Sequence, residues 1–119
     1  MSGRIYAMHE YQQEAQKTIP VNLTPEEVRD NAVYGLCGEV GELVDILKKV
    51  KYQGHAFTEE TKRHLLLECG DVLYYIAQMV TGLNSNLNLV AAMNIDKIRA
   101  RYGDRFDSEK SIHRKEGDI

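Results

Sequence analysis

Two pairs of acidic residues with the same spacing are the part of this sequence that could do chemistry. Glu39 and Glu42 form the first pair, and Glu68 and Asp71 form the second. Residues three apart lie on one face of an α-helix, so each pair would point in one direction. Carboxylate oxygens are the ligands that Mg²⁺ prefers. Four of them predict a metal site for Mg²⁺, with Mn²⁺ as an alternative, acting on a phosphorylated substrate.

The spacing of apolar residues places both pairs in long helices. A period of 3.6 residues predicts helices over about residues 24–51 and 58–80. On the first helix Glu39 falls within the apolar stripe and Glu42 on its flank, and Glu68 and Asp71 take the same positions on the second. Two helices joined by a short connection pack antiparallel, so we expect the two acidic pairs to meet between them.

An acidic pair on a helix also has simpler explanations. Most such pairs form a solvated face beside the core, and others form buried ion pairs with Lys or Arg. Two pairs in matching positions on apolar faces favour a metal site over either alternative. Glycine costs about 1 kcal/mol relative to alanine inside a helix, so glycines near the acids need a reason. We expect close backbone approach or room for a ligand at four of them: Gly35, Gly38, Gly41 and Gly70.

The remaining pattern predicts an all-α fold of four helices. Further helices are expected over about residues 5–18 and 87–102. Thr24 and Thr58 are suitable caps for the two acidic helices, the first within a capping box. Residues 104–119 are charged and lack a clear period, so we expect an extended tail. At 119 residues the whole chain, 1–119, is interpreted as one domain.

The last long helix carries polar residues that complement an acidic metal site. Asn94, Lys97 and Arg101 lie within one narrow sector of its surface. Lys and Arg in this arrangement could bind the phosphate oxygens that a metal leaves uncovered. The simpler alternative is a solvated polar face. Beside an acidic metal site we favour phosphate binding.

Two further side chains are expected one helical turn from the acids. Tyr75 follows Asp71 by one turn and could stack on a base or bond to a sugar or phosphate. More often such a tyrosine belongs to the core, with its hydroxyl satisfied. His64 precedes Glu68 by one turn and would line the site or lie at its rim.

Composition excludes several classes of function. The net charge of −3 argues against a nucleic-acid-binding surface. The sequence shows no signal peptide and no apolar stretch of membrane-spanning length, which favours a cytoplasmic protein without a membrane partner. Cys37 and Cys69 lack metal-ligand spacing, and we expect both to be buried, reduced thiols.

In combination these residues resemble the MazG-type all-α nucleoside triphosphate pyrophosphohydrolases. The family motif, E-x-x-E followed by a spacer and E-x-x-D, corresponds to Glu39-Val40-Gly41-Glu42, twenty-five residues, and Glu68-Cys69-Gly70-Asp71. The segment MNIDKIRARY resembles the family's Asn-x-x-Lys-x-x-x-Arg segment, at Asn94, Lys97 and Arg101. The resemblance extends over most of the chain.

The resemblance implies a four-helix bundle completed by oligomerisation into a homodimer or a homotetramer of paired dimers. It implies cleavage of a nucleoside triphosphate between the α and β phosphates, releasing a nucleoside monophosphate and pyrophosphate, as in house-cleaning of the nucleotide pool. Water would attack in line, with Glu39 as one candidate for the general base. The four acids would hold Mg²⁺, and the cations on the last helix, with Asn94 and Tyr75, would bind the substrate.

The sequence determines neither which nucleotide is the substrate nor whether the protein is an enzyme at all. Within the enzyme class, a dUTP or dCTP hydrolase and the phosphoribosyl-ATP pyrophosphohydrolase of histidine synthesis are alternatives. Outside it, a helical module that binds nucleotide or metal without catalysis, or that only dimerises, remains the competing interpretation.

Overall fold

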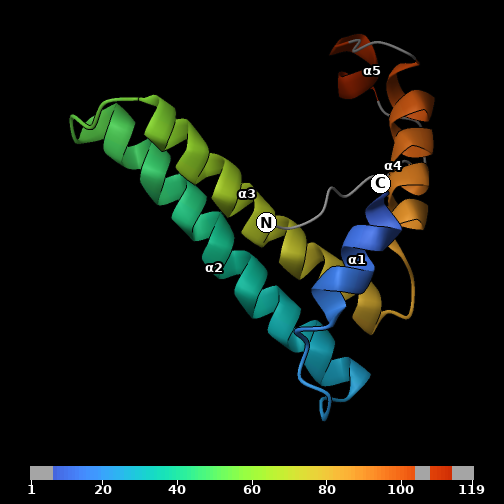
Figure 1. Cartoon of the computed structure of the whole chain (residues 1–119). Coiled ribbons are helices and arrows are strands. Elements are labelled where there is room, and N and C mark those ends of the chain that lie inside the picture. Colours follow the sequence, from blue (N-terminus) through green and yellow to red (C-terminus); the bar gives the residue numbers. More distant parts are fainter. Residues whose placement is uncertain (1–6, 104–107, 114–119) are drawn as a thin grey trace. The chain divides into compact units, whose positions relative to one another are not determined.

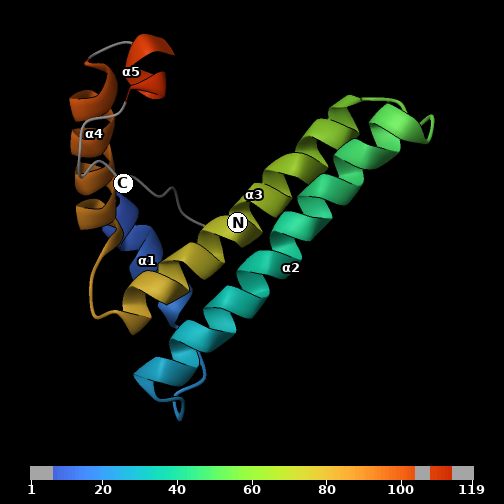
Figure 2. The same ribbon diagram turned by 180° about the vertical axis from the view of Figure 1, so that it is seen from behind.

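The structure, a computed structural model, describes residues 7–103 and 108–113. Every regular element in these ranges is an α-helix, which confirms the predicted all-α class (Figures 1 and 2). The helices are α1 (Met8–Gln16), α2 (Pro25–Tyr52), α3 (Glu59–Gly82), α4 (Leu87–Tyr102) and α5 (Ser108–Ile112). Helix α5 lies within the segment that we expected to be extended. The beginning of the first predicted helix and the rest of the tail lie outside the described residues.

Capping interactions determine where the two long helices begin. The Thr24 hydroxyl accepts a hydrogen bond from the Glu27 amide at 3.1 Å, and the Glu27 carboxylate accepts one from the Thr24 amide at 3.0 Å. Thr58 and Thr61 exchange equivalent bonds at the beginning of α3. These bonds satisfy amide groups that have no partner within the helix. Both predicted helix starts are therefore confirmed.

Helices α2 and α3 form an antiparallel hairpin, and α1 packs against α3 at the end away from the connecting loop (Figures 1 and 2). The loop contains Gly54 at a φ of +72°, a conformation that glycine adopts without steric cost. The Gln12 amide of α1 donates to the Thr81 hydroxyl and to the Ser85 carbonyl, each at 3.0 Å. These bonds fix α1 near the end of α3.

The buried core of the hairpin lies at one end. Its buried apolar residues are Val28 and Ala32 of α2, with Ala77 and Val80 of α3. The buried Gln78 amide donates to the Val28 carbonyl at 2.9 Å and so crosses between the helices. No residue between 33 and 76 is buried to this degree. The half of the hairpin nearer the loop is thus held by the packing of only two helices.

The residues from Leu87 onward form a second compact unit, which we describe by itself. Within it α4 contacts α5. Gly103 follows α4 with a φ of +71°, and its amide donates to the Arg99 carbonyl at 2.8 Å. Glycine favours this left-handed conformation, which ends α4 where the sequence predicts.

Candidate metal centre

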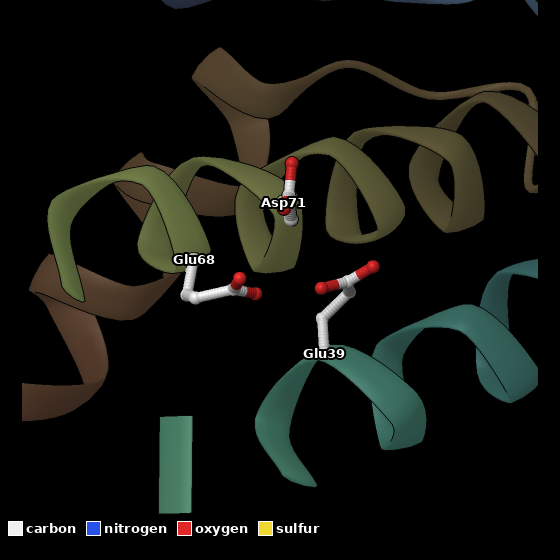
Figure 3. Close-up of side chains that lie close together, drawn as sticks. All are labelled: Glu39, Glu68 and Asp71. Atoms are coloured by element: carbon white, nitrogen blue, oxygen red, sulfur yellow. The ribbon is translucent and has the colours of Figure 1, made fainter. Parts of the chain in front are cut away.

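Three of the four predicted acids come together between α2 and α3. Glu39 extends from α2 toward α3, which carries Glu68 and Asp71 (Figure 3). One carboxylate oxygen from each residue lies within 4.8 Å of the other two. Glu39 and Glu68 are half-buried and Asp71 is exposed. The antiparallel hairpin therefore brings together acids from both motifs, as their helical positions led us to expect.

The fourth acid, Glu42, lies outside this group. Its side chain is exposed, one turn further along α2. Its negative charge still contributes to raising the pKa of Glu39, although its effect is smaller than those of Glu68, desolvation and Asp71. The structure thus distinguishes a group of three carboxylates from a peripheral fourth.

The group of three is electrostatically crowded. Hydrogen bonding with the Glu68 side chain is the largest cause that raises the pKa of Glu39, followed by desolvation and by the negative charge of Asp71. A hydrogen bond between two carboxyl groups requires a proton on one of them. The crowding therefore makes ionisation of Glu39 less favourable than in water, and a bound cation would compensate for this.

Glu68 has a buried oxygen atom that lacks a partner. The side chain is 13% exposed, and its Oε1 lies 3.5 Å from Nε2 of His64. Its Oε2 is buried and accepts no hydrogen bond from the described residues. A buried carboxylate oxygen left without a partner is costly, and a bound cation would satisfy it. The all-oxygen donor set fits Mg²⁺ or Mn²⁺.

Tyr75 packs across the gap between the helices beside the acids. A Cβ atom added to Gly35 would lie 2.2 Å from Cε1 of the Tyr75 ring, so only glycine leaves space for this contact. Gly35 lies one turn before Glu39, and Tyr75 lies one turn after Asp71. The Tyr75 ring is therefore held against α2 one helical turn from the acids, and a role in the site stays a prediction.

The other glycines near the acids have a different surrounding. No atom lies within 4 Å of a Cβ added at Gly38, Gly41 or Gly70. Close approach between α2 and α3 thus explains Gly35 alone. The other three lie beside open space, and the second expectation, room for a ligand, stays a prediction for them.

Helix α1 contributes a residue near the site that the sequence analysis did not identify. Burial raises the pKa of Tyr11, and the neighbouring Tyr74 and Asp71 raise it further. The Thr18 hydroxyl also forms a hydrogen bond with the Tyr74 hydroxyl. Tyr11 was missed because its proximity to Asp71 depends on how α1 packs on α3, and helical spacing carries no information on that packing.

The three predicted phosphate ligands lie on α4, in the second unit. Asn94 and Lys97 are exposed, and Arg101 is half-buried. They share one sector of α4, as predicted from their spacing.

The expectation that both cysteines are buried is wrong for this chain. Cys37 and Cys69 are free and exposed. Each long helix has its main packing partner on one side, so apolar residues on its other side remain exposed. The segments around the two cysteines are apolar, as the sequence indicates, but much of their apolar surface is exposed in the single chain.

Comparison with known proteins decides the family. The sequence model of the MazG nucleotide pyrophosphohydrolase domain matches residues 29–106, which include α3, α4 and most of α2. The chain belongs to this MazG family. It is also 35% identical over 68 residues to the Gene 37 protein of Mycobacterium phage L5. That match covers 56% of this chain and 60% of the relative, less than two thirds of its length.

The MazG family is a family of nucleotide pyrophosphohydrolase domains, and its members generally depend on divalent metal. The acidic group between α2 and α3 lies within the matched MazG region. No solved structure matches the chain. Among the described helices, none combines the length and the apolar character needed to cross a membrane.

Proposed function

We propose that this protein is a Mg²⁺-dependent nucleoside triphosphate pyrophosphohydrolase that releases a nucleoside monophosphate and pyrophosphate. The observation that supports this most strongly is the group formed by Glu39, Glu68 and Asp71, with ligand atoms within 4.8 Å of one another. A cation would also satisfy the buried Oε2 of Glu68, which has no hydrogen-bond partner among the described residues. MazG membership supplies the nucleotide as the class of substrate.

The acids have separate roles in this proposal. Glu39, Glu68 and Asp71 hold the cation, with Glu42 at the edge of the site. When bound, Mg²⁺ neutralises charge on the phosphate oxygens as the phosphoanhydride bond breaks. Glu39 is the candidate general base, because it extends from α2 into the acidic group, where it could also orient the attacking water.

Side chains outside the acidic group would orient the substrate. Tyr75, already held against α2, offers a ring face beside the acids. Lys97 and Arg101, with Asn94, would neutralise and orient the polyphosphate. The support for these three is their shared sector on α4 and their match to the family segment.

We further propose that the chain functions as a homo-oligomer, a dimer or a tetramer of paired dimers. Helix α2 carries a stripe of exposed apolar residues that are 42–57% exposed, which we call the outer stripe: Val33, Val40, Val44 and Leu47. Their spacing of seven, four and three residues places them on one face of the helix. A second copy would cover this stripe, and symmetric pairing is the commonest way to do so.

The proposal is tested by measuring pyrophosphate release from a panel of canonical, deoxy and modified nucleoside triphosphates. We expect Mg²⁺-dependent release from at least one nucleotide. We expect Glu39→Gln and Asp71→Asn each to abolish it. Asp30→Asn is the matched control, because it removes an exposed carboxylate of α2 outside the site.

Release that is equally strong in the Glu39→Gln variant would remove the acidic group from the mechanism. Binding of nucleotide without release from any member of the panel would favour the competing interpretation, a helical module that binds nucleotide without catalysis.

A further inference from the structure

A second feature of the hairpin lies beside the acidic group and has no role in the proposed mechanism. A hollow of about 470 Å³ is formed by the last turns of α2, the connecting loop and the first turns of α3. This volume lies within the range of small-molecule sites in proteins, about 300–1,000 Å³. Among the residues that line it are the apolar Ile46, Val50 and Leu67.

The hollow begins one helical turn from the acidic group. His64 lines the hollow, and its Nε2 lies 3.5 Å from Oε1 of Glu68. Leu67, another lining residue, immediately precedes Glu68. Four residues of a helix rise by about 6 Å, so one small molecule can extend from the hollow to the acidic group.

The polar part of the lining is rich in hydrogen-bond donors. Lys49 and Arg63 line the hollow, together with the imidazoles of His55 and His64. The hydroxyls of Thr58 and Thr61 also line it, but they are already bonded to each other and to the Ala56 carbonyl. Lys49 is paired with Asp45 at 2.9 Å, whereas Arg63 forms no ion pair with the described residues. One carboxylate, that of Glu60, also lines the hollow. A lining that combines these donors with apolar side chains suits a ring with carbonyl acceptors on its edge.

We propose that this hollow binds the nucleoside end of the substrate, with preference for a base that presents carbonyl oxygens. This inference rests on the proposed function, which places the phosphates at the acidic group. A free polyphosphate is a poorer fit, because the apolar side chains of Ile46, Val50 and Leu67 cannot replace the water that phosphate oxygens lose. The hollow therefore selects the base, and the acidic group acts on the phosphates.

The first experiment uses nucleosides without phosphates, so that it does not depend on hydrolysis or metal. Uridine, thymidine, cytidine, adenosine and guanosine are titrated into the ¹⁵N-labelled chain. We expect amide shifts centred on Ala56, Thr61 and Leu67, and largest for uridine and thymidine. Ala56→Trp, which fills the hollow, should remove them. Phe57→Trp is the matched control, because Phe57 is exposed on the same loop and does not line the hollow.

Shifts that survive in Ala56→Trp, or that centre on other residues, would overturn the inference. So would the absence of any shift for all five nucleosides. This readout needs no catalysis. A chain that binds nucleosides here but releases no pyrophosphate would contradict the proposed function, whereas the inference that the hollow binds nucleosides would stand.

The second experiment compares steady-state kinetics of two variants with the same change in charge. Arg63→Gln removes a cation that lines the hollow, and Lys62→Gln removes one on the same turn of α3 that does not. We expect Arg63→Gln to raise KM by roughly tenfold with little change in kcat, the loss from one hydrogen bond to a charged donor. Equal KM values for the two variants would exclude Arg63 from base recognition and contradict the inference.

Discussion

At the level of single residues, the acidic group shows a conflict between stability and function. Glu39 lies where Glu68 and Asp71 both disfavour its ionised form. A carboxyl whose pKa is raised by folding stabilises the native state while it is protonated, and this contribution is lost as pH rises through the raised pKa. Near neutral pH the metal-free chain therefore carries an unfavourable charge at its site, which a cation would compensate.

Replacing Glu39 by Gln should therefore stabilise the metal-free protein. In the presence of EDTA at neutral pH, we expect the Tm of Glu39→Gln to exceed that of the wild type, because the amide removes one of the crowded charges. As pH falls below the raised pKa of Glu39, this carboxyl becomes protonated in the wild type and the difference in Tm should shrink. Thermal unfolding monitored by circular dichroism across the acidic to neutral range measures it.

Glu42→Gln serves as the comparison, because Glu42 is exposed and has the weakest recorded effect on Glu39. Its Tm in EDTA should change less than that of Glu39→Gln. Added Mg²⁺ should raise the Tm of the wild type more than that of Glu39→Gln. A lower Tm for Glu39→Gln in EDTA would show that the acidic group is not under electrostatic strain.

At the level of the helices, two glycines of α2 should respond in opposite directions to the same substitution. Gly35→Ala places a methyl group 2.2 Å from the Tyr75 ring, so the ring or the helix must move. Overpacking of this kind costs about 1–3 kcal/mol. Gly38→Ala meets no atom within 4 Å and should stabilise the helix by up to about 1 kcal/mol. Urea unfolding of both variants, with the m-value held fixed, gives the two free energies.

The double variant Gly35→Ala, Tyr75→Ala tests the cause. If the clash with the ring is responsible, the cost of Gly35→Ala should disappear when Tyr75 is already alanine. A cost that persists in the double variant would assign the effect to the helix backbone instead.

The sequence predicted what local spacing determines and missed what packing between distant segments determines. The caps at Thr24 and Thr58 and the helical positions of Glu39 and Glu68 follow from neighbours within one turn, and the structure agrees with each. The approach of Tyr11 to Asp71 depends on how α1 docks on α3, and no pattern within α1 encodes it.

At the level of the whole chain, burial is concentrated in one part of the hairpin. The buried residues of α2 and α3 lie at the end away from the loop, and the residues between 33 and 76 include none. The acidic group and the hollow both lie in this less buried half. The outer stripe on α2 adds exposed apolar surface to the same half, and Cys37 lies close to it. Association of two copies would account for the sparse burial of this half, the exposed outer stripe and the exposed Cys37.

Val44→Lys should therefore disrupt assembly. Val44 is the most exposed member of the outer stripe, at 57%, and a lysine there would be buried without a partner in an oligomer. We expect the wild type to sediment as a dimer or tetramer and Val44→Lys to sediment as a monomer with a lower Tm. Asn31→Lys is the control, because it adds the same charge to an exposed position of α2 away from the stripe, and its assembly should match the wild type. A wild type that sediments as a monomer at micromolar concentration, with a Tm independent of concentration, would mean that the outer stripe is not an interface between copies.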